Sequence, residues 1–234
     1  EGRAMGPSAE PSLIYGMPPK EMSLDDMRII RESFAAAAVR AREAGFDMVE
    51  IHGAHGYLLC QFLSPIANRR TDEYGSTMKN RARFVVEAIE EVRRRVGNEF
   101  PVSLRLSIDE SIRGGYTEED MLTVIPDFVR AGADVIHASL GTYGTPGGIT
   151  SAPVEFEPGF NAFRARKVKE VVDVPVIAVG RFTDLSVADA VIGRKDADLV
   201  SFGRQFLADP DFLVKARDGR FEDIRTCIAC NQGC

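Results

Sequence analysis

The chain has 234 residues, is 44% hydrophobic and contains 12 prolines, so its composition is that of a globular protein rather than a disordered or fibrous one. Its 29 basic and 35 acidic residues give a formal net charge of -6, which argues against a nucleic-acid partner. No run of about 18 apolar residues occurs, and no basic start precedes an apolar stretch, so neither a membrane span nor a signal peptide is expected. A cytoplasmic location is the resulting expectation.

The two ends of the chain suggest that the sequence is part of a longer protein. It begins at Glu1 without a methionine and stops at Cys234 within a group of cysteines. The functional predictions therefore concern the parent protein. Residues 1–22 are rich in proline and predict an irregular segment, residues 23–222 show no linker and predict one domain, and residues 223–234 form a cysteine motif.

Short apolar runs alternate with longer amphipathic segments, which is the pattern of repeated strand–helix units around a buried parallel sheet. Helices are predicted at Leu24–Ala44 behind the N-cap Ser23, at Asn80–Val96, and at Met121–Ala131 behind a capping box of Thr117 and Asp120. Strands are predicted at Met48–His52, Val102–Leu106, Val135–Ala138, Val176–Val179 and Leu199–Phe202. Five such units fit either an open doubly wound sheet or the last five units of an eight-unit barrel.

A dense group of polar and aromatic residues follows the first predicted strand. His52, His55 and Tyr57 stand close together, and Gly53 and Gly56 allow the bend that would bring both imidazoles to one site. Imidazole N–H groups can hold a carbonyl oxygen that becomes enolate-like, and a tyrosine hydroxyl can supply a proton. The alternative is that the histidines satisfy buried backbone groups or bind a metal.

Polar residues also mark later segments. Arg105 lies inside an apolar strand, where a buried guanidinium needs an anion or a ring that gains negative charge, although an ion pair with Asp109 or Glu110 is a competing explanation. The polar segment 68–76 is most simply a loop that caps the following helix.

Two Gly-Arg pairs end the last two predicted strands. They are Gly180-Arg181 and Gly203-Arg204. In a barrel, the loops after strands 7 and 8 commonly bind phosphate, because glycine permits close backbone approach and arginine neutralises charge. Either pair alone would be weak support, since a glycine after a strand usually only makes the turn.

Three of the four cysteines crowd the end of the chain, at Cys227, Cys230 and Cys234. This spacing does not suggest a disulfide framework, and it favours three ligands of a [4Fe–4S] cluster with a fourth cysteine further on. Zinc is the main alternative, although structural zinc usually takes two separated pairs of ligands.

Together these segments resemble the Old Yellow Enzyme family of FMN-dependent oxidoreductases, especially its iron–sulfur branch of 2,4-dienoyl-CoA reductases, enoate reductases and trimethylamine dehydrogenase. The segments that carry the resemblance are 7–9, 52–58, 62–65, 68–75, 105–107, 203–204 and 227–234. The resemblance implies an α/β fold, a (β/α)₈ TIM barrel of which this chain holds strands 4 to 8, followed by the start of the cluster motif. It also implies FMN, a [4Fe–4S] cluster and NAD(P)H as cofactors, with FAD in a full-length parent.

The resemblance assigns a role to each matching residue. His52 and His55 correspond to the pair that holds the substrate oxygen, and Tyr57 to the proton donor. Arg105 corresponds to the arginine beside the flavin N1–C2=O edge. Gly180, Arg181, Gly203 and Arg204 fall where the family binds the FMN phosphate, and Cys227, Cys230 and Cys234 match cluster ligands.

Three departures from the family affect the substrate prediction. Tyr143 stands where dienoyl-CoA reductases have a histidine acid, those enzymes tend not to carry both His52 and His55, and strands 1 to 3 are absent. We therefore predict an ene-reductase acting on a small unsaturated acid, acyl-CoA or carbonyl compound, within a homo-oligomeric parent. The alternatives are amine oxidation on the same scaffold, a non-catalytic cluster-binding module, and a zinc-dependent barrel hydrolase.

Overall fold

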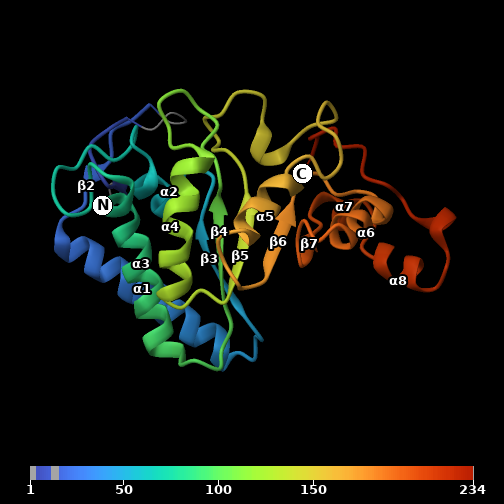
Figure 1. Cartoon of the computed structure of the whole chain (residues 1–234), viewed down its shortest axis with the longest axis horizontal. Helices are drawn as coiled ribbons and strands as arrows, with labels where there is room; N and C mark the ends of the chain where they lie inside the picture. Colours follow the sequence, from blue (N-terminus) through green and yellow to red (C-terminus); the bar gives the residue numbers. More distant parts are fainter. Residues whose placement is uncertain (1–3, 12–15, 234) are drawn as a thin grey trace.

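The computed structural model describes residues 4–11 and 16–233 of the chain. Its main element is a five-stranded parallel sheet in the order β3-β4-β5-β6-β7 (Figure 1). The strands are β3 (Val49–Gly53), β4 (Val102–Ser107), β5 (Val135–Ser139), β6 (Val176–Val179) and β7 (Leu199–Ser201). Each predicted strand is therefore confirmed to within one residue at either end, because an apolar run marks every one of them.

Helices connect these strands and cover one face of the sheet. They are α1 (Leu24–Glu43), α2 (Leu58–Leu63), α3 (Met78–Val96), α4 (Glu118–Arg130), α5 (Ala162–Lys169), α6 (Leu185–Gly193), α7 (Arg204–Ala208) and α8 (Phe212–Arg217), with short 3₁₀ turns η1 (Ile149–Ser151) and η2 (Phe221–Asp223). Figure 1 shows α1, α3 and α4 together along one side of the strands. None of the helices in the described part of the chain is long and apolar enough to cross a membrane.

Capping residues fix where the helices begin. Thr117 forms the predicted capping box with Asp120, and the predicted N-cap Ser23 forms one as well, with Asp26. Because Thr117 is the N-cap itself, α4 begins at Glu118, three residues before the predicted start. Helix α3 likewise begins at Met78, since the side chain of Thr77 accepts a hydrogen bond from the Asn80 N–H.

The predicted irregular segment 1–22 contains two short strands, and its residues 1–3 and 12–15 lie outside the described residues. Within it, β1 (Met5–Gly6) and β2 (Lys20–Glu21) form a small parallel pair. The buried side chain of Arg70 ties this pair to the polar segment 68–76, since its Nη1 donates to the carbonyl oxygens of Pro7 and Met22 at 3.1 and 2.9 Å. The polar segment is therefore an anchor for the N-terminal residues as well as the lead into α3.

The core of the fold lies between the sheet and its helices. The residues that carry it on the strands are Ile51, Leu104, Leu106, Ile136, Ala138, Val176 and Ala178, each at most 4% exposed. Because side chains alternate along a strand, the residues between them point to the opposite face. That opposite face carries the functional candidates.

Candidate active site

The first site element is the turn after β3, which brings His52, His55 and Tyr57 together. His55 has a positive φ of 62° and Gly56 a positive φ of 83°, so the chain bends sharply here, as predicted. A Cβ on Gly56 would lie 3.2 Å from Thr142, in the loop after β5. His55 and Thr142 form a parallel bridge, which places the neighbouring Tyr143 beside the histidines.

Four rings consequently form one cluster. The ring centroid of His52 lies 5.2 Å from that of His55 and 5.3 Å from that of Tyr57. The ring centroids of Tyr57 and Tyr143 are 5.6 Å apart, in an edge-on contact. The tyrosines are half exposed, at 49% and 53%, whereas His55 is buried. The cluster therefore presents two tyrosines at its surface above two histidines.

Both histidines are held in the neutral form. Burial, followed by the positive charge of Arg105, lowers the pKa of His55 to about 3, and the same two causes lower the pKa of His52. His55 is also fixed in place: its Nε2 lies 2.7 Å from Ser139 Oγ, and its backbone N–H donates to Ser107 Oγ at 3.0 Å. Only Nδ1 of His55 is thus left for a ligand.

A charged layer lies beneath this cluster on the same face of the sheet. His52 of β3, Arg105 of β4 and His137 of β5 are direct neighbours in the strand register. Glu50 accepts hydrogen bonds from Ser103 Oγ and lies 2.9 Å from His137 Nδ1. Burial lowers the pKa of Arg105, and the carboxylate of Glu50 opposes that shift. Among the described residues no ion pair joins Arg105 to Asp109 or Glu110, so the predicted alternative is not found.

The sequence interpretation missed His137, Glu50 and Ser139. Residues two positions apart on a strand lie on the same face. Glu50 therefore shares a face with His52, and His137 shares a face with Ser139. Within the described residues, the buried Nε of Arg105 and the buried Nε2 of His137 have no hydrogen-bond partner. Such atoms are costly to leave unpaired, so they mark where a polar ligand would fit.

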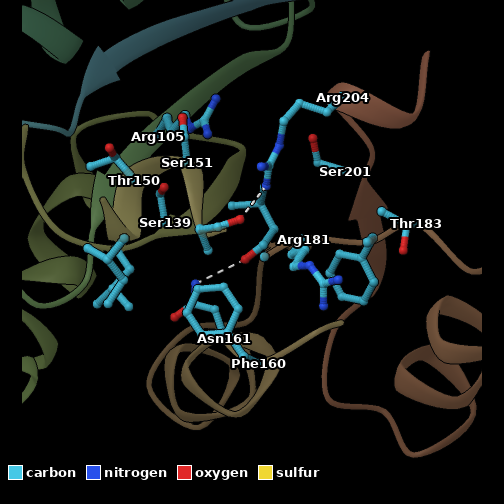
Figure 2. Close-up of a pocket in the computed structure, with 17 residues that line it drawn as sticks. Arg105, Ser139, Thr150, Ser151, Phe160, Asn161, Arg181, Thr183, Ser201 and Arg204 are labelled. Atoms are coloured by element: carbon cyan, nitrogen blue, oxygen red, sulfur yellow. Dashed lines mark hydrogen bonds between the residues drawn. The ribbon is translucent and has the colours of Figure 1, made fainter. Parts of the chain in front are cut away.

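A cavity of about 180 Å³ opens beside Arg105 at the carboxyl ends of β5, β6 and β7. Figure 2 shows its arginines around one space. The cavity brings together all five predicted cofactor-binding residues, namely Arg105, Gly180, Arg181, Gly203 and Arg204. Ser139 also lines it, so this one residue touches both the cavity and His55.

The Gly-Arg pairs shape this cavity in different ways. A Cβ on Gly180 would come within 3.0 to 3.2 Å of Asn161, whose amide bridges the carbonyls of Ala138 and Val179, so glycine is needed for packing there. A Cβ on Gly203 would meet nothing within 4 Å, so that glycine leaves room at the cavity wall. Arg181 donates to the Phe156 carbonyl, and its buried Nε has no partner in the described chain.

The cysteine segment, residues 224–231, lies against α7. Cys227 is half-buried and Cys230 is exposed, while Cys234 lies outside the described residues. The Ala229 N–H donates to Cys227 Sγ at 3.4 Å. Among residues 4–11 and 16–233, no group of three or more His, Cys, Asp or Glu side chains is placed to hold a metal ion.

The remaining cysteine, Cys60, belongs to the core. It is fully buried, and its Sγ lies 3.3 Å from the Tyr116 hydroxyl. Burial raises the pKa of its thiol to about 12, so it stays protonated and unreactive.

The chain resembles known proteins along almost its whole length. Residues 3–223 match the NADH:flavin oxidoreductase / NADH oxidase family. The chain is 40% identical to an NADH oxidase of Thermoanaerobacter brockii over 98% of this chain and 35% of that protein, and 35% identical to a cinnamate reductase of Clostridium sporogenes over 99% and 37%.

A solved structure of a 2-naphthoyl-CoA reductase complex superposes with a TM-score of 0.93 at 32% identity, covering 98% of this chain and 35% of that one. The chain thus spans about a third of the length of these relatives. Because the family match covers almost the whole chain, including the cavity and the ring cluster, the chain belongs to the NADH:flavin oxidoreductase / NADH oxidase family.

Proposed function

We propose that this chain is the substrate-facing part of an FMN-dependent ene-reductase, which reduces the C=C bond of an α,β-unsaturated acid, acyl-CoA or carbonyl compound with electrons from NAD(P)H. The observation that carries the proposal is the adjacency of two sites. A cavity holding Arg105 and both Gly-Arg pairs lies next to a cluster of two tyrosines and two neutral histidines, and Arg105 and Ser139 connect them.

The fold supports this reading. A parallel sheet whose polar side chains gather at the carboxyl ends of its strands is the arrangement of barrel active sites. We infer that β3 to β7 are strands 4 to 8 of a (β/α)₈ barrel, and that three further strand–helix units of the parent protein complete it. The NADH oxidase and the 2-naphthoyl-CoA reductase, which are about three times as long as this chain, are consistent with that inference.

The described residues fit FMN. Arg181 and Arg204 at the far end of the cavity would hold its phosphate, and Arg105 would lie at the ring, where a positive charge stabilises the reduced form. The unpaired Nε atoms of Arg105 and Arg181 are the specific sign that anionic or polar ligand atoms belong there. When bound, FMN supplies hydride transfer, which no amino-acid side chain can perform.

The side chains of the ring cluster have distinct tasks. His52 and the free Nδ1 of His55 would hold the substrate oxygen. A neutral imidazole carries one N–H group, so each ring can donate one hydrogen bond to an oxygen that gains enolate-like charge. The Tyr57 hydroxyl would protonate the α-carbon, and Tyr143, in edge-on contact with Tyr57, is a second donor.

Cys227, Cys230 and Cys234 are proposed as three ligands of a [4Fe–4S] cluster. The support is the spacing of two thiols three residues apart and the Ala229 N–H group that donates to Cys227 Sγ, a contact that favours a thiolate. Anaerobic reconstitution with iron and sulfide tests this directly, since three serine replacements should abolish iron binding.

Replacing Tyr57 by phenylalanine tests the catalytic assignment. In the protein purified with its flavin, Tyr57→Phe should slow alkene reduction by about 10² to 10⁴, because the proton donor is lost. Bleaching of the flavin band at about 450 nm by NAD(P)H should proceed at the normal rate, because that step needs no substrate proton.

Tyr143→Phe is the matched control, since it removes the other exposed hydroxyl of the cluster and should have a smaller effect on alkene reduction. Unchanged turnover in Tyr57→Phe would refute the role of Tyr57. Absence of any flavin band in the purified parent protein would refute the proposed function altogether.

A further inference from the structure

The cysteine segment contacts residues that line the cavity. Figure 1 shows the chain running back from α8 to the ends of β6 and β7. The fully buried Gln205, one residue after Arg204, accepts a hydrogen bond from the Cys227 N–H and donates to the Arg225 carbonyl, both at 2.9 Å. Asp209 accepts from the Arg225 N–H at 2.9 Å. Helix α7 therefore holds the cysteine segment by its backbone.

A second contact joins the same segment directly to the cavity. Asn231, one residue after Cys230, accepts a hydrogen bond from Arg204 Nη1 through Oδ1. Its Nδ2 donates to the Ser151 carbonyl at 2.6 Å. Arg204 and Ser151 both line the cavity, so one amide joins two of its walls. Asn231 has a positive φ of 53°, a conformation that asparagine tolerates better than most residues do.

These contacts orient Arg204 without neutralising it. Its Nη2 donates to the Ala152 carbonyl at 2.8 Å, so both terminal nitrogens have partners and both partners are uncharged. Within the described chain, Arg204 makes no ion pair with a carboxylate. A long, flexible side chain is thus fixed at the cavity wall while its positive charge remains available to an anion.

We propose that Asn231 is a positioning residue that couples the phosphate end of the cavity to the cysteine segment. A phosphate bound by Arg204 favours the conformation in which Asn231 and Gln205 hold residues 224–231 in place. By linkage, an ordered cysteine segment raises the affinity for the phosphate by the same factor. The inference depends on the proposed function only in taking the bound phosphate to be that of FMN.

Hydrogen exchange and flavin binding together test the coupling. In the wild-type protein, FMN and inorganic phosphate should slow backbone exchange in residues 224–231, whereas riboflavin, which has no phosphate, should not. Asn231→Ala should weaken FMN binding, measured by quenching of flavin fluorescence, by about tenfold, because Arg204 is then no longer held in position before the phosphate binds. FMN should then no longer slow exchange in the segment.

Two further variants make the test specific. Gln232→Ala changes an exposed neighbour of Asn231 and should behave as the wild type. Gln205→Leu releases the backbone of Arg225 and Cys227 without touching Arg204, so it should speed exchange in the segment and lower FMN affinity by a smaller factor than Asn231→Ala.

The possible outcomes separate this inference from the proposed function. Three outcomes would each overturn the coupling while leaving the ene-reductase proposal intact. They are wild-type FMN affinity in Asn231→Ala, equal protection of the segment by riboflavin and FMN, and flavin binding that leaves hydrogen exchange unchanged. Protection by phosphate in a protein that binds no flavin would leave the coupling intact and refute the proposed function.

Discussion

The two faces of the five-stranded sheet differ in almost every property. The face toward the helices carries aliphatic side chains that are nearly inaccessible to solvent, such as Leu104 and Ile136. The opposite face carries ionisable or hydroxylated side chains on the same strands, including Glu50, Arg105 and His137. Since neighbouring residues of one strand point to opposite faces, each strand serves both purposes at once.

This difference separates stability from function within single strands. Burial of apolar surface is the main favourable term in folding, and here the helix-facing residues supply it. The polar face adds hydrogen bonds within the protein, but it also keeps buried atoms without partners. We therefore expect substitutions on the two faces to differ in both the size and the sign of their effect on the free energy of unfolding.

The largest effect on stability is expected from Leu104→Ala. Leu104 is completely buried between β4 and the helices, and its truncation leaves a cavity that the surrounding side chains fill only in part. The free energy of unfolding should fall by about 2 to 5 kcal/mol. Urea denaturation followed by circular dichroism measures this change.

Ser103→Ala is the matched control, one residue away on the other face. Ser103 donates a single hydrogen bond to Glu50, and its loss should cost only about 1 kcal/mol. Equal destabilisation by the two substitutions would contradict the expectation that the helix-facing side chains contribute most to the free energy of unfolding.

The sequence predicted one face better than the other. Strand positions followed from aliphatic runs, and those runs are the helix-facing residues themselves. On the polar face the sequence predicted Arg105, which stands out in its apolar strand, and His52, which belongs to the dense polar group after the first strand. The contact between Glu50 and His137 joins residues 87 positions apart, and no local pattern specifies such a pairing.

The cavity was predictable for a physical reason, and its link to the cysteine segment was not. The carboxyl ends of parallel strands meet at one edge of a sheet, so Arg105, Gly180 and Gly203 had to approach one another once the strands were recognised. The contact between Asn231 and Arg204 depends on how an irregular segment returns from α8, which neither periodicity nor capping residues encode.

An intermediate effect is expected from the pH dependence of His55. Folding lowers the pKa of His55 from 6.5 to about 3, so between these values the unfolded chain takes up a proton that the folded protein excludes. Stability should therefore be complete above about pH 6.5 and fall as the solution is acidified. For one such histidine the loss between pH 7 and pH 5 is about 2 kcal/mol.

His55→Gln removes this titration and should flatten the change over that interval, as measured by denaturation at each pH. The control is Glu43→Gln, an exposed carboxylate at the end of α1. Identical pH profiles for the wild type and His55→Gln would show that His55 does not exclude a proton in the folded state.

The smallest effect on stability, with the opposite sign, is expected from Arg105→Met. The guanidinium is largely buried, its Nε has no partner in the described chain, and desolvation is the main cause that lowers its pKa. Glu50 keeps its hydrogen bonds from Ser103 and with His137 when Arg105 is removed, so no unpaired carboxylate results. An apolar side chain of similar length should leave the free energy of unfolding unchanged or raise it by about 1 kcal/mol. The functional cost should appear elsewhere. On the proposed placement of Arg105 beside the flavin ring, its loss should make the reduction potential of the bound flavin more negative. Arg105→Lys keeps the charge, so the reduction potential of its flavin should stay close to the wild-type value.

A marked loss of stability in Arg105→Met would mean that the polar face also stabilises the fold. The contrast between the two faces would then not hold at Arg105.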